Sequence, residues 1–323
     1  MLSKLSLLFA AAMILVAAAP NKAPGPPGPV FVTLGTAGGP LPNSQRSQPA
    51  NAVVIGNDAI LFDTGDGAAE RMAASGIRLA QVNTVFLSHL HLDHTAGLAG
   101  VIGLRWMIGG VGPLHVYGPP GTRELVDGLR ASMLPAQRVG YGFDDGFGSD
   151  PIAIEVVELA DGQNVEPTPG VRVRVAENTH YSFSKASAAA SRGTALSFRI
   201  EAQGRSIVYT GDTGPSEAVT KLAKGADLLV SEVQDLDALL ASIRRQGLSV
   251  PPPILTKLTE HLRRHHISPE DVGRMATDAG VGGVVLTHLG PVLDQSAADA
   301  LFLPKVRTTY KGPVVVAADL GRY

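Results

Sequence analysis

The amino-acid sequence predicts a layered α/β fold for residues 30–323. Short runs rich in β-branched residues recur along the chain between glycine-rich turns, and helical patterns alternate with these runs. The chain has 323 residues, of which 45% are hydrophobic and 17% charged, so it can bury a large core. Together these observations indicate stacked layers of helices and sheets.

The first half of the chain alternates strand and helix patterns. Strand-like runs occupy residues 30–34, 52–55, 59–62, 84–87, 115–117, 152–158 and 171–176. Helical patterns occupy residues 68–74, 95–104 and 121–133. The second half repeats this arrangement, with strands at 195–200, 206–209, 228–230 and 284–286 and helices at 217–223 and 269–279.

An apolar-rich helical insertion is predicted at residues 234–265. It contains Leu239, Leu240 and Ile243, and the breaker Pro251–Pro253 interrupts it. Two interpretations stay open. The insertion is either a lid over a site or an ordinary helical layer over the edge of a sheet.

The N-terminus has the pattern of a secretory signal. Lys4 supplies positive charge, residues 5–16 are mainly apolar, and three alanines follow at 17–19. The apolar stretch is shorter than the roughly 20 residues that span a membrane. We therefore expect a signal peptide at 1–19, a Pro/Gly-rich leader at 20–29, and a secreted or periplasmic protein without stable membrane insertion after cleavage. Pro20 leaves the cleavage point open, with an uncleaved anchor as the alternative.

Charge and cysteine content exclude some classes of site. The formal net charge is −2, and Arg263 with Arg264 makes only a short basic pair, so the sequence predicts no nucleic-acid partner. The chain has no cysteine, so it is stable without disulfides, and any metal must be held by nitrogen and oxygen ligands.

A dense group of metal-ligand residues follows the strand at 84–87. His89, His91, Asp93 and His94 lie within one strand-to-helix turn. Imidazole nitrogens and carboxylate oxygens suit zinc, and a turn can direct alternate side chains toward two neighbouring metal positions. The segment therefore predicts a metal centre. By contrast, His115 and His261 stand alone and are interpreted as ordinary core or surface residues.

Further ligands are expected from distant strand ends. His180 follows the strand at 171–176, Asp212 follows the strand at 206–209, and His288 follows the strand at 284–286. Each would close a strand and open a turn, which is where a layered α/β fold places functional side chains.

Several motifs together resemble the metallo-β-lactamase superfamily, within it the branch of tRNase Z and the arylsulfatase-type enzymes. They are Leu34–Pro40, Ile60–Gly67, the His89 motif, Val116–Pro119, Gly211–Asp212 and Thr287–His288. The resemblance covers residues 30–290. It implies a four-layer αββα sandwich in which 30–323 form the catalytic domain.

The same resemblance implies a zinc-dependent hydrolase with two Zn²⁺ per chain. His89, His91 and His180 would bind the first ion; Asp93, His94 and His288 would bind the second; Asp212 would bridge them. A hydroxide between the ions would be the nucleophile, and Asp93 would also orient it. Iron or manganese could occupy the same nitrogen and oxygen ligands.

Two more residues receive catalytic roles from the resemblance. His266 corresponds to a histidine that assists the leaving group, and Ser268 with Asp271 forms a capping box that would fix its direction. Glu232 occupies the place of a glutamate that orients this histidine. The tRNA-processing enzymes have histidine where this chain has Ser231, so the local pattern departs from theirs.

For the substrate, the resemblance and the retained His266 imply a small-molecule phosphodiester or sulfate ester. A β-lactam or lactone is the alternative, and a non-catalytic metal-binding module is the alternative from another class. The resemblance implies a long substrate-gripping arm between the positions of His180 and Asp212 in tRNA-processing members. This chain has only a short connection there, no basic surface and a secretion signal, so tRNA 3′ processing is not expected. The oligomeric state stays open.

Overall fold

The computed structural model describes residues 28–109, 112–140, 152–183, 193–245 and 250–323. The expected signal peptide at 1–19 and the leader up to residue 27 lie outside the described residues. Among the helices of the described ranges, none is long and apolar enough to cross a membrane.

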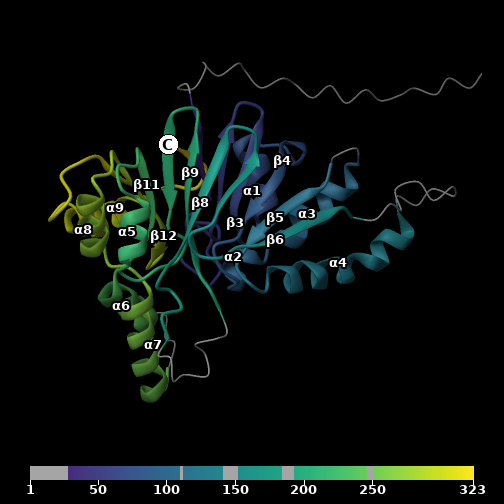
Figure 1. Cartoon of the computed structure of the whole chain (residues 1–323). Coiled ribbons are helices and arrows are strands. Elements are labelled where there is room, and N and C mark those ends of the chain that lie inside the picture. Colours follow the sequence, from purple (N-terminus) through teal and green to yellow (C-terminus); the bar gives the residue numbers. More distant parts are fainter. Residues whose placement is uncertain (1–27, 110–111, 141–151, 184–192, 246–249) are drawn as a thin grey trace, which may run out of the picture.

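Two mixed β-sheets lie face to face in the middle of the molecule (Figure 1). In the described part of the chain each has seven strands. The first sheet runs in the order β14 (Gly321–Arg322), β1 (Val30–Gly35), β2 (Ala50–Ile55), β3 (Asp58–Thr64), β4 (Val82–Phe86), β5 (Leu114–Gly118), β6 (Ile154–Glu158). The second sheet runs in the order β13 (Val314–Val316), β12 (Val284–Gly290), β11 (Leu228–Gln234), β10 (Arg205–Tyr209), β9 (Leu196–Ala202), β8 (Val171–Glu177), β7 (Asn164–Thr168).

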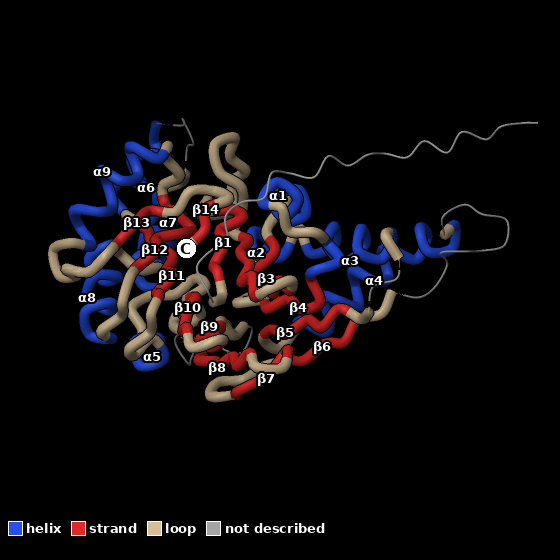
Figure 2. Tube along the Cα trace, turned by 90° about the horizontal axis from the view of Figure 1, so that it is seen from above, coloured by secondary structure: helices blue, strands red, loops and turns tan. Residues whose placement is uncertain are grey.

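Helices cover the outer faces of both sheets, as the view in Figure 2 shows. On the side of the first sheet lie α1 (Ala68–Ser75), the short α2 (Leu92–Thr95), α3 (Leu98–Met107) and α4 (Thr122–Val139), with a 3₁₀ turn at Leu79–Gln81. On the side of the second sheet lie α5 (Glu217–Leu222), α8 (Pro269–Ala279) and α9 (Gln295–Val306). The helices α6 (Leu236–Arg245) and α7 (Pro252–His265) belong to the predicted insertion and extend away from the sheets (Figure 1).

Three hydrophobic cores hold these layers together. One lies between the sheets, and one lies between each sheet and its helices. In the central core the rings of Phe62 and Phe86 stack with centroids 5.1 Å apart, and Phe198 meets Phe86 edge-on at 5.3 Å. Such pairs contribute about 0.5–1.5 kcal/mol each beyond their buried area. The expected four-layer αββα sandwich is confirmed.

Most predicted strands and helices are present with bounds shifted by a few residues, but several elements were missed. Among these are β7, α9, β13 and β14. Pro167 and Pro304 interrupt the patterns of β7 and α9. The two-residue β14 exists because Arg322 pairs with Val32 at the other end of the chain, and such a long-range pairing leaves no local pattern.

Candidate metal centre

The residues expected to bind metal gather in one cluster at strand ends from both sheets. They are His89, His91, Asp93, His94, His180, Asp212 and His288. The turn after β4 supplies the first four, and the others follow β8 and β10 or lie in β12. All are buried except the exposed His91 and the half-buried Asp93. The open side of the cluster is therefore beside these two residues.

The first expected ligand group forms one compact set of nitrogens. His89 Nε2 lies 3.0 Å from His91 Nδ1, and His180 Nε2 lies 3.2 Å from the same atom. One ligand atom from each residue lies within 4.8 Å of the other two. The set can hold one metal ion.

The second expected group lies beside the first, with Asp212 between them. Asp93 Oδ2 is 3.6 Å from both His94 Nε2 and His288 Nε2. Asp212 Oδ1 lies 3.3 Å from each of the same two nitrogens, and Asp212 Oδ2 lies 3.9 Å from His89 Nε2. One carboxylate thus faces both groups.

Buried atoms without hydrogen-bond partners are a second indication, besides the distances, that the cluster can bind metal ions. His94 Nε2, His288 Nε2 and Asp212 Oδ1 are buried and have no hydrogen-bond partner among the described residues. Buried polar atoms normally have hydrogen-bond partners. These three atoms lack such partners and face one another, so they can serve as the ligand atoms of a cation. Nitrogen and oxygen donors of this kind suit zinc.

Charge in the cluster leads to the same conclusion. Burial opposes ionisation of Asp212, yet His288 and His94 lower the pKa of this carboxyl well below its usual range. Burial likewise opposes a charge on His94, but Asp212 and Asp63 raise the pKa of its imidazole well above the usual value. Burial and His94 hold the pKa of His89 well below the usual value. The buried carboxylates therefore draw positive charge into the cluster, which a metal ion would supply.

Asp63 is a supporting residue to which the sequence analysis gave no role. Its Oδ2 lies 2.8 Å from His94 Nδ1 and accepts hydrogen bonds from Ser88 Oγ and Tyr209 Oη, both at 2.7 Å. A carboxylate on the second nitrogen of a metal-binding histidine fixes its tautomer and direction. Its signal in the sequence was the motif Ile60–Gly67, which was used for the resemblance without a role for Asp63.

Two β-bulges orient the side chains of Asp63 and His288 toward the site. In β3 the pairing register jumps from Phe62 to Thr64, and in β12 it jumps from Thr287 to Leu289. The residues left out are Asp63 and His288, whose φ angles are 59° and 46°. A bulge turns one side chain away from the regular alternation of a strand. His288 therefore lies inside β12, and the expectation that it closes the strand was wrong.

His266 and Glu232 lie together, as the sequence analysis expected. His266 Nδ1 is 2.8 Å from Glu232 Oε2, and Thr213 N–H donates a hydrogen bond to Glu232 Oε1. The ring centroid of His266 is 4.9 Å from that of His180. Burial raises the pKa of Glu232 and lowers that of His266. The Ser268 cap is also present, because Ser268 Oγ accepts a hydrogen bond from the Asp271 backbone N–H.

His261 does not stand alone as the sequence analysis described it, because it lies close to other histidines of the site. Its ring centroid lies 6.0 Å from that of His180 and 5.6 Å from that of His266. Its Nδ1 lies 2.9 Å from His265 Nδ1, and His265 O accepts a hydrogen bond from His180 Nδ1 at 2.9 Å. The spacing of His261 and His265 by one helical turn was the signal that could have revealed this. His115 lies on β5, where it pairs with Glu155 at 3.2 Å.

The helices α6 and α7 carry exposed basic side chains, and α7 ends at this cluster. Arg244, Arg245, Lys257, Arg263 and Arg264 are all exposed, and no ion pair or side-chain hydrogen bond joins any of them to the described residues. The two helices contain only two acidic residues, Asp237 and Glu260. The C-terminal end of α7 reaches the cluster through His265.

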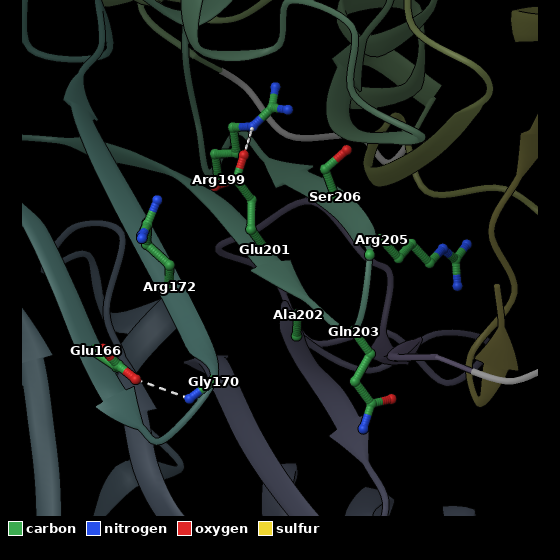
Figure 3. A pocket seen from close by; sticks show the side chains of 10 residues that line it. Glu166, Gly170, Arg172, Arg199, Glu201, Ala202, Gln203, Arg205 and Ser206 are labelled. Carbon is green, nitrogen blue, oxygen red and sulfur yellow. Dashed lines mark hydrogen bonds and ion pairs between the residues drawn. The ribbon is translucent and has the colours of Figure 1, made fainter.

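A separate hollow lies at the turn between β9 and β10 (Figure 3). Its volume is about 440 Å³, and its lining includes Arg172, Arg199 and Glu201. Arg199 Nε donates to Glu201 at 2.9 Å. None of the expected ligands lines this hollow, so it is distinct from the metal centre.

Comparison with known proteins identifies the family. A model of the β-lactamase superfamily domain matches residues 58–289. Ribonuclease Z of Mycolicibacterium paratuberculosis is 35% identical over 270 residues, which cover 82% of this chain and 87% of the relative. Ribonuclease Z of Mycobacterium marinum is 33% identical over 299 residues, which cover 91% of this chain and 98% of the relative. The metallo-β-lactamase fold protein YhfI of Bacillus subtilis shares the fold, with a TM-score of 0.66, 18% identity, and coverage of 92% and 99%.

These relatives correct the expected function and partner. The sequence analysis expected a small-molecule phosphodiester or sulfate ester, or a lactam or lactone, as substrate, and no nucleic-acid partner. This expectation was wrong, because both relatives are named ribonuclease Z. The short connection between His180 and Asp212 does not set the chain apart from this family, because it matches one such relative over 98% of that relative's length. The argument from charge fails because α7, which carries the exposed Arg263 and Arg264, ends at the metal centre, and the sequence alone did not show this position.

The alternative of a non-catalytic module is wrong for the same reason. The ligand set is complete, its buried atoms are free to bind a cation, and the relatives are enzymes by name. The chain belongs to the metallo-β-lactamase superfamily, in the branch that contains ribonuclease Z, and is a metal-dependent hydrolase.

Proposed function

We propose that this protein is an endonuclease of the ribonuclease Z type, which hydrolyses one phosphodiester bond at the 3′ side of precursor tRNA. The observation that carries the proposal is the match to ribonuclease Z over 98% of the relative's length. The exposed Arg263 and Arg264 at the end of α7 support it, because cationic side chains near a catalytic site attract the phosphates of RNA.

For the metal we propose zinc in both ligand groups. His89, His91 and His180 would hold one ion, and Asp93, His94 and His288 would hold the other, with Asp212 shared between them. Bound zinc supplies Lewis acidity for the scissile phosphate and for the attacking water. Asp63 contributes by holding His94 in the orientation that presents Nε2 to the ion.

His266 is proposed as the proton donor to the departing ribose oxygen. Its Nδ1 is occupied by Glu232, so Nε2 is the nitrogen left for the substrate. Glu232 acts through His266 as a positioning residue, and its own place is fixed by the Thr213 N–H. A donor placed in this way contributes roughly 10²- to 10⁴-fold to the rate.

The test is cleavage of a precursor tRNA transcript by the zinc-loaded protein. Asp212→Ala should abolish cleavage. His266→Ala should lower kcat by roughly 10²- to 10⁴-fold while zinc content, measured by mass spectrometry, stays that of the wild type. No cut in any precursor tRNA would refute the proposed function, and loss of zinc from His266→Ala would refute the role of His266.

The cellular location is a separate proposal that depends on the N-terminal pattern alone. We propose export directed by residues 1–19, with their charged and apolar segments followed by small residues. Fractionation with N-terminal sequencing tests this. A chain that starts near residue 20 in an exported fraction would support export, and a full-length chain in the cytoplasm would contradict it.

A further inference from the structure

A second cavity opens directly beside the metal centre. Its volume is about 300 Å³, within the range of ligand sites. Its lining includes Leu90, His91, Pro120, Tyr181, Phe183 and Thr194. His91 is the exposed histidine of the centre, so the cavity lies on the side from which a substrate can approach.

The walls of this aromatic pocket are mainly aromatic and aliphatic, and they carry no carboxylate, lysine or arginine among the described residues. The rings of Tyr181 and Phe183 are nearly parallel, with an interplanar angle of 24° and centroids 5.8 Å apart. The described lining offers a phosphate no cationic side chain, whereas it offers a flat uncharged ring aromatic faces.

The main aromatic wall is held in place before a ligand arrives. A Cβ at Gly193 would lie 2.9 Å from two carbons of the Tyr181 ring, so the backbone passes close against this ring. The ring of His91 meets Tyr181 at 87°, with centroids 5.3 Å apart. Because neighbours restrict Tyr181 on more than one side, little side-chain entropy is lost when a ligand binds.

We infer that the aromatic pocket binds the nucleobase of a nucleotide adjoining the scissile phosphodiester. The inference rests on the proposed function and specifies which part of the RNA the pocket binds. The phosphate lies at the metal centre, His91 borders both regions, and a base linked to that phosphate reaches the pocket. Stacking accepts any base, so recognition here depends on the presence of a base more than on its identity.

The experiment combines Tyr181→Ala with substrates that lack one base. Precursor RNA is prepared intact, with an abasic nucleotide 5′ of the cut, or with one 3′ of the cut. On intact RNA, Tyr181→Ala should raise KM about tenfold or more, whereas Tyr181→Phe should retain most of the affinity. On one of the two abasic RNAs the effect of Tyr181→Ala should disappear. Zinc content is measured in each variant, because Tyr181 adjoins His180.

Fluorescence provides a reading that does not depend on cleavage. RNA with 2-aminopurine beside the cut should lose fluorescence on binding to the metal-free wild type and to Tyr181→Phe, but not to Tyr181→Ala. An equal KM effect on all three RNAs, or equal quenching by all three proteins, would overturn the inference. Quenching without any RNA cleavage would refute the proposed function and leave the pocket as a base-binding site.

Discussion

Asp63 and His288 show how single residues shape this site. Both have a left-handed backbone, which costs a residue other than glycine about 1–3 kcal/mol. Each is the extra residue of a bulge, and each directs its side chain toward His94 or the carboxylates around it. The rest of the fold compensates for this local strain, which is typical of functional positions.

At the residue scale, Asp63→Asn should weaken metal binding without unfolding the protein. The amide keeps the shape of the side chain but removes the charge that faces His94 Nδ1 at 2.8 Å. We expect a loss of about 10- to 100-fold in zinc affinity, measured by competition with a chelator, and partial recovery of activity in excess zinc.

Tyr209→Phe is the matched control for Asp63. It removes one hydrogen bond to Asp63 and leaves the carboxylate charge and the contact with His94 in place. Its zinc affinity should lie between those of the wild type and Asp63→Asn. Equal zinc affinity in wild type and Asp63→Asn would show that Asp63 only supports the fold.

At the element scale, the end of α7 is docked against the metal centre. His265 O accepts a hydrogen bond from His180, and a Cβ at Gly214 would lie 2.2 Å from Arg264 O. Gly214 therefore has to lack a side chain for α7 to approach the turn that carries Asp212. This docking brings the exposed Arg263 and Arg264 to the neighbourhood of the site.

The double variant Arg263→Ala/Arg264→Ala should bind precursor tRNA more weakly and cleave a small diester normally. Both side chains are exposed, and no described residue pairs with them, so their removal should not disturb the fold. We expect a higher KM for RNA and a shallower salt dependence, by about one unit of slope per lost phosphate contact. The small substrate is bis(p-nitrophenyl) phosphate, whose kcat/KM should stay unchanged.

Arg307→Ala is the control for that double variant. Arg307 is exposed at the end of α9, in the helical layer outside the second sheet. Its replacement should alter neither the KM for RNA nor the salt slope. If Arg307→Ala and the α7 variant weakened RNA binding equally, overall charge and not the position of α7 would be responsible.

At the scale of the whole molecule, metal binding and folding are linked. The three hydrophobic cores do not include the ligand cluster, so the metal-free protein should remain folded. In the cluster the carboxylates of Asp93 and Asp212 lie close together among several histidines, and a bound cation would compensate their negative charge. Metal should therefore stabilise the folded state by mass action.

Removal of zinc with a chelator should lower Tm by roughly 10 °C. Ligand at a thousandfold excess over Kd contributes about 4 kcal/mol, and each kcal/mol shifts the Tm of a large domain by about 2–4 °C. Differential scanning calorimetry measures the shift, and Asp212→Ala should show a much smaller one. An unchanged Tm in the wild type would mean that the cluster does not bind metal in the folded protein.

The sequence alone determined the layers and the dense ligand turn. Both are local patterns: hydrophobic periodicity specifies strands and helices, and His89, His91, Asp93 and His94 lie so close in the chain that one turn brings them together. The tertiary structure places His180, Asp212 and His288 beside them; the first two follow strands as the sequence had located them, whereas His288 lies at a bulge within β12.

Only the tertiary structure decided how this centre is supported and reached. Asp63 contacts His94 because a bulge in β3 turns it inward, and His261 joins the cluster because α7 docks beside it. The exposed Arg263 and Arg264 lie near the metal centre only because the end of α7 docks there. A linear pattern records neighbours in the chain, whereas these features depend on contacts between segments that are far apart in sequence.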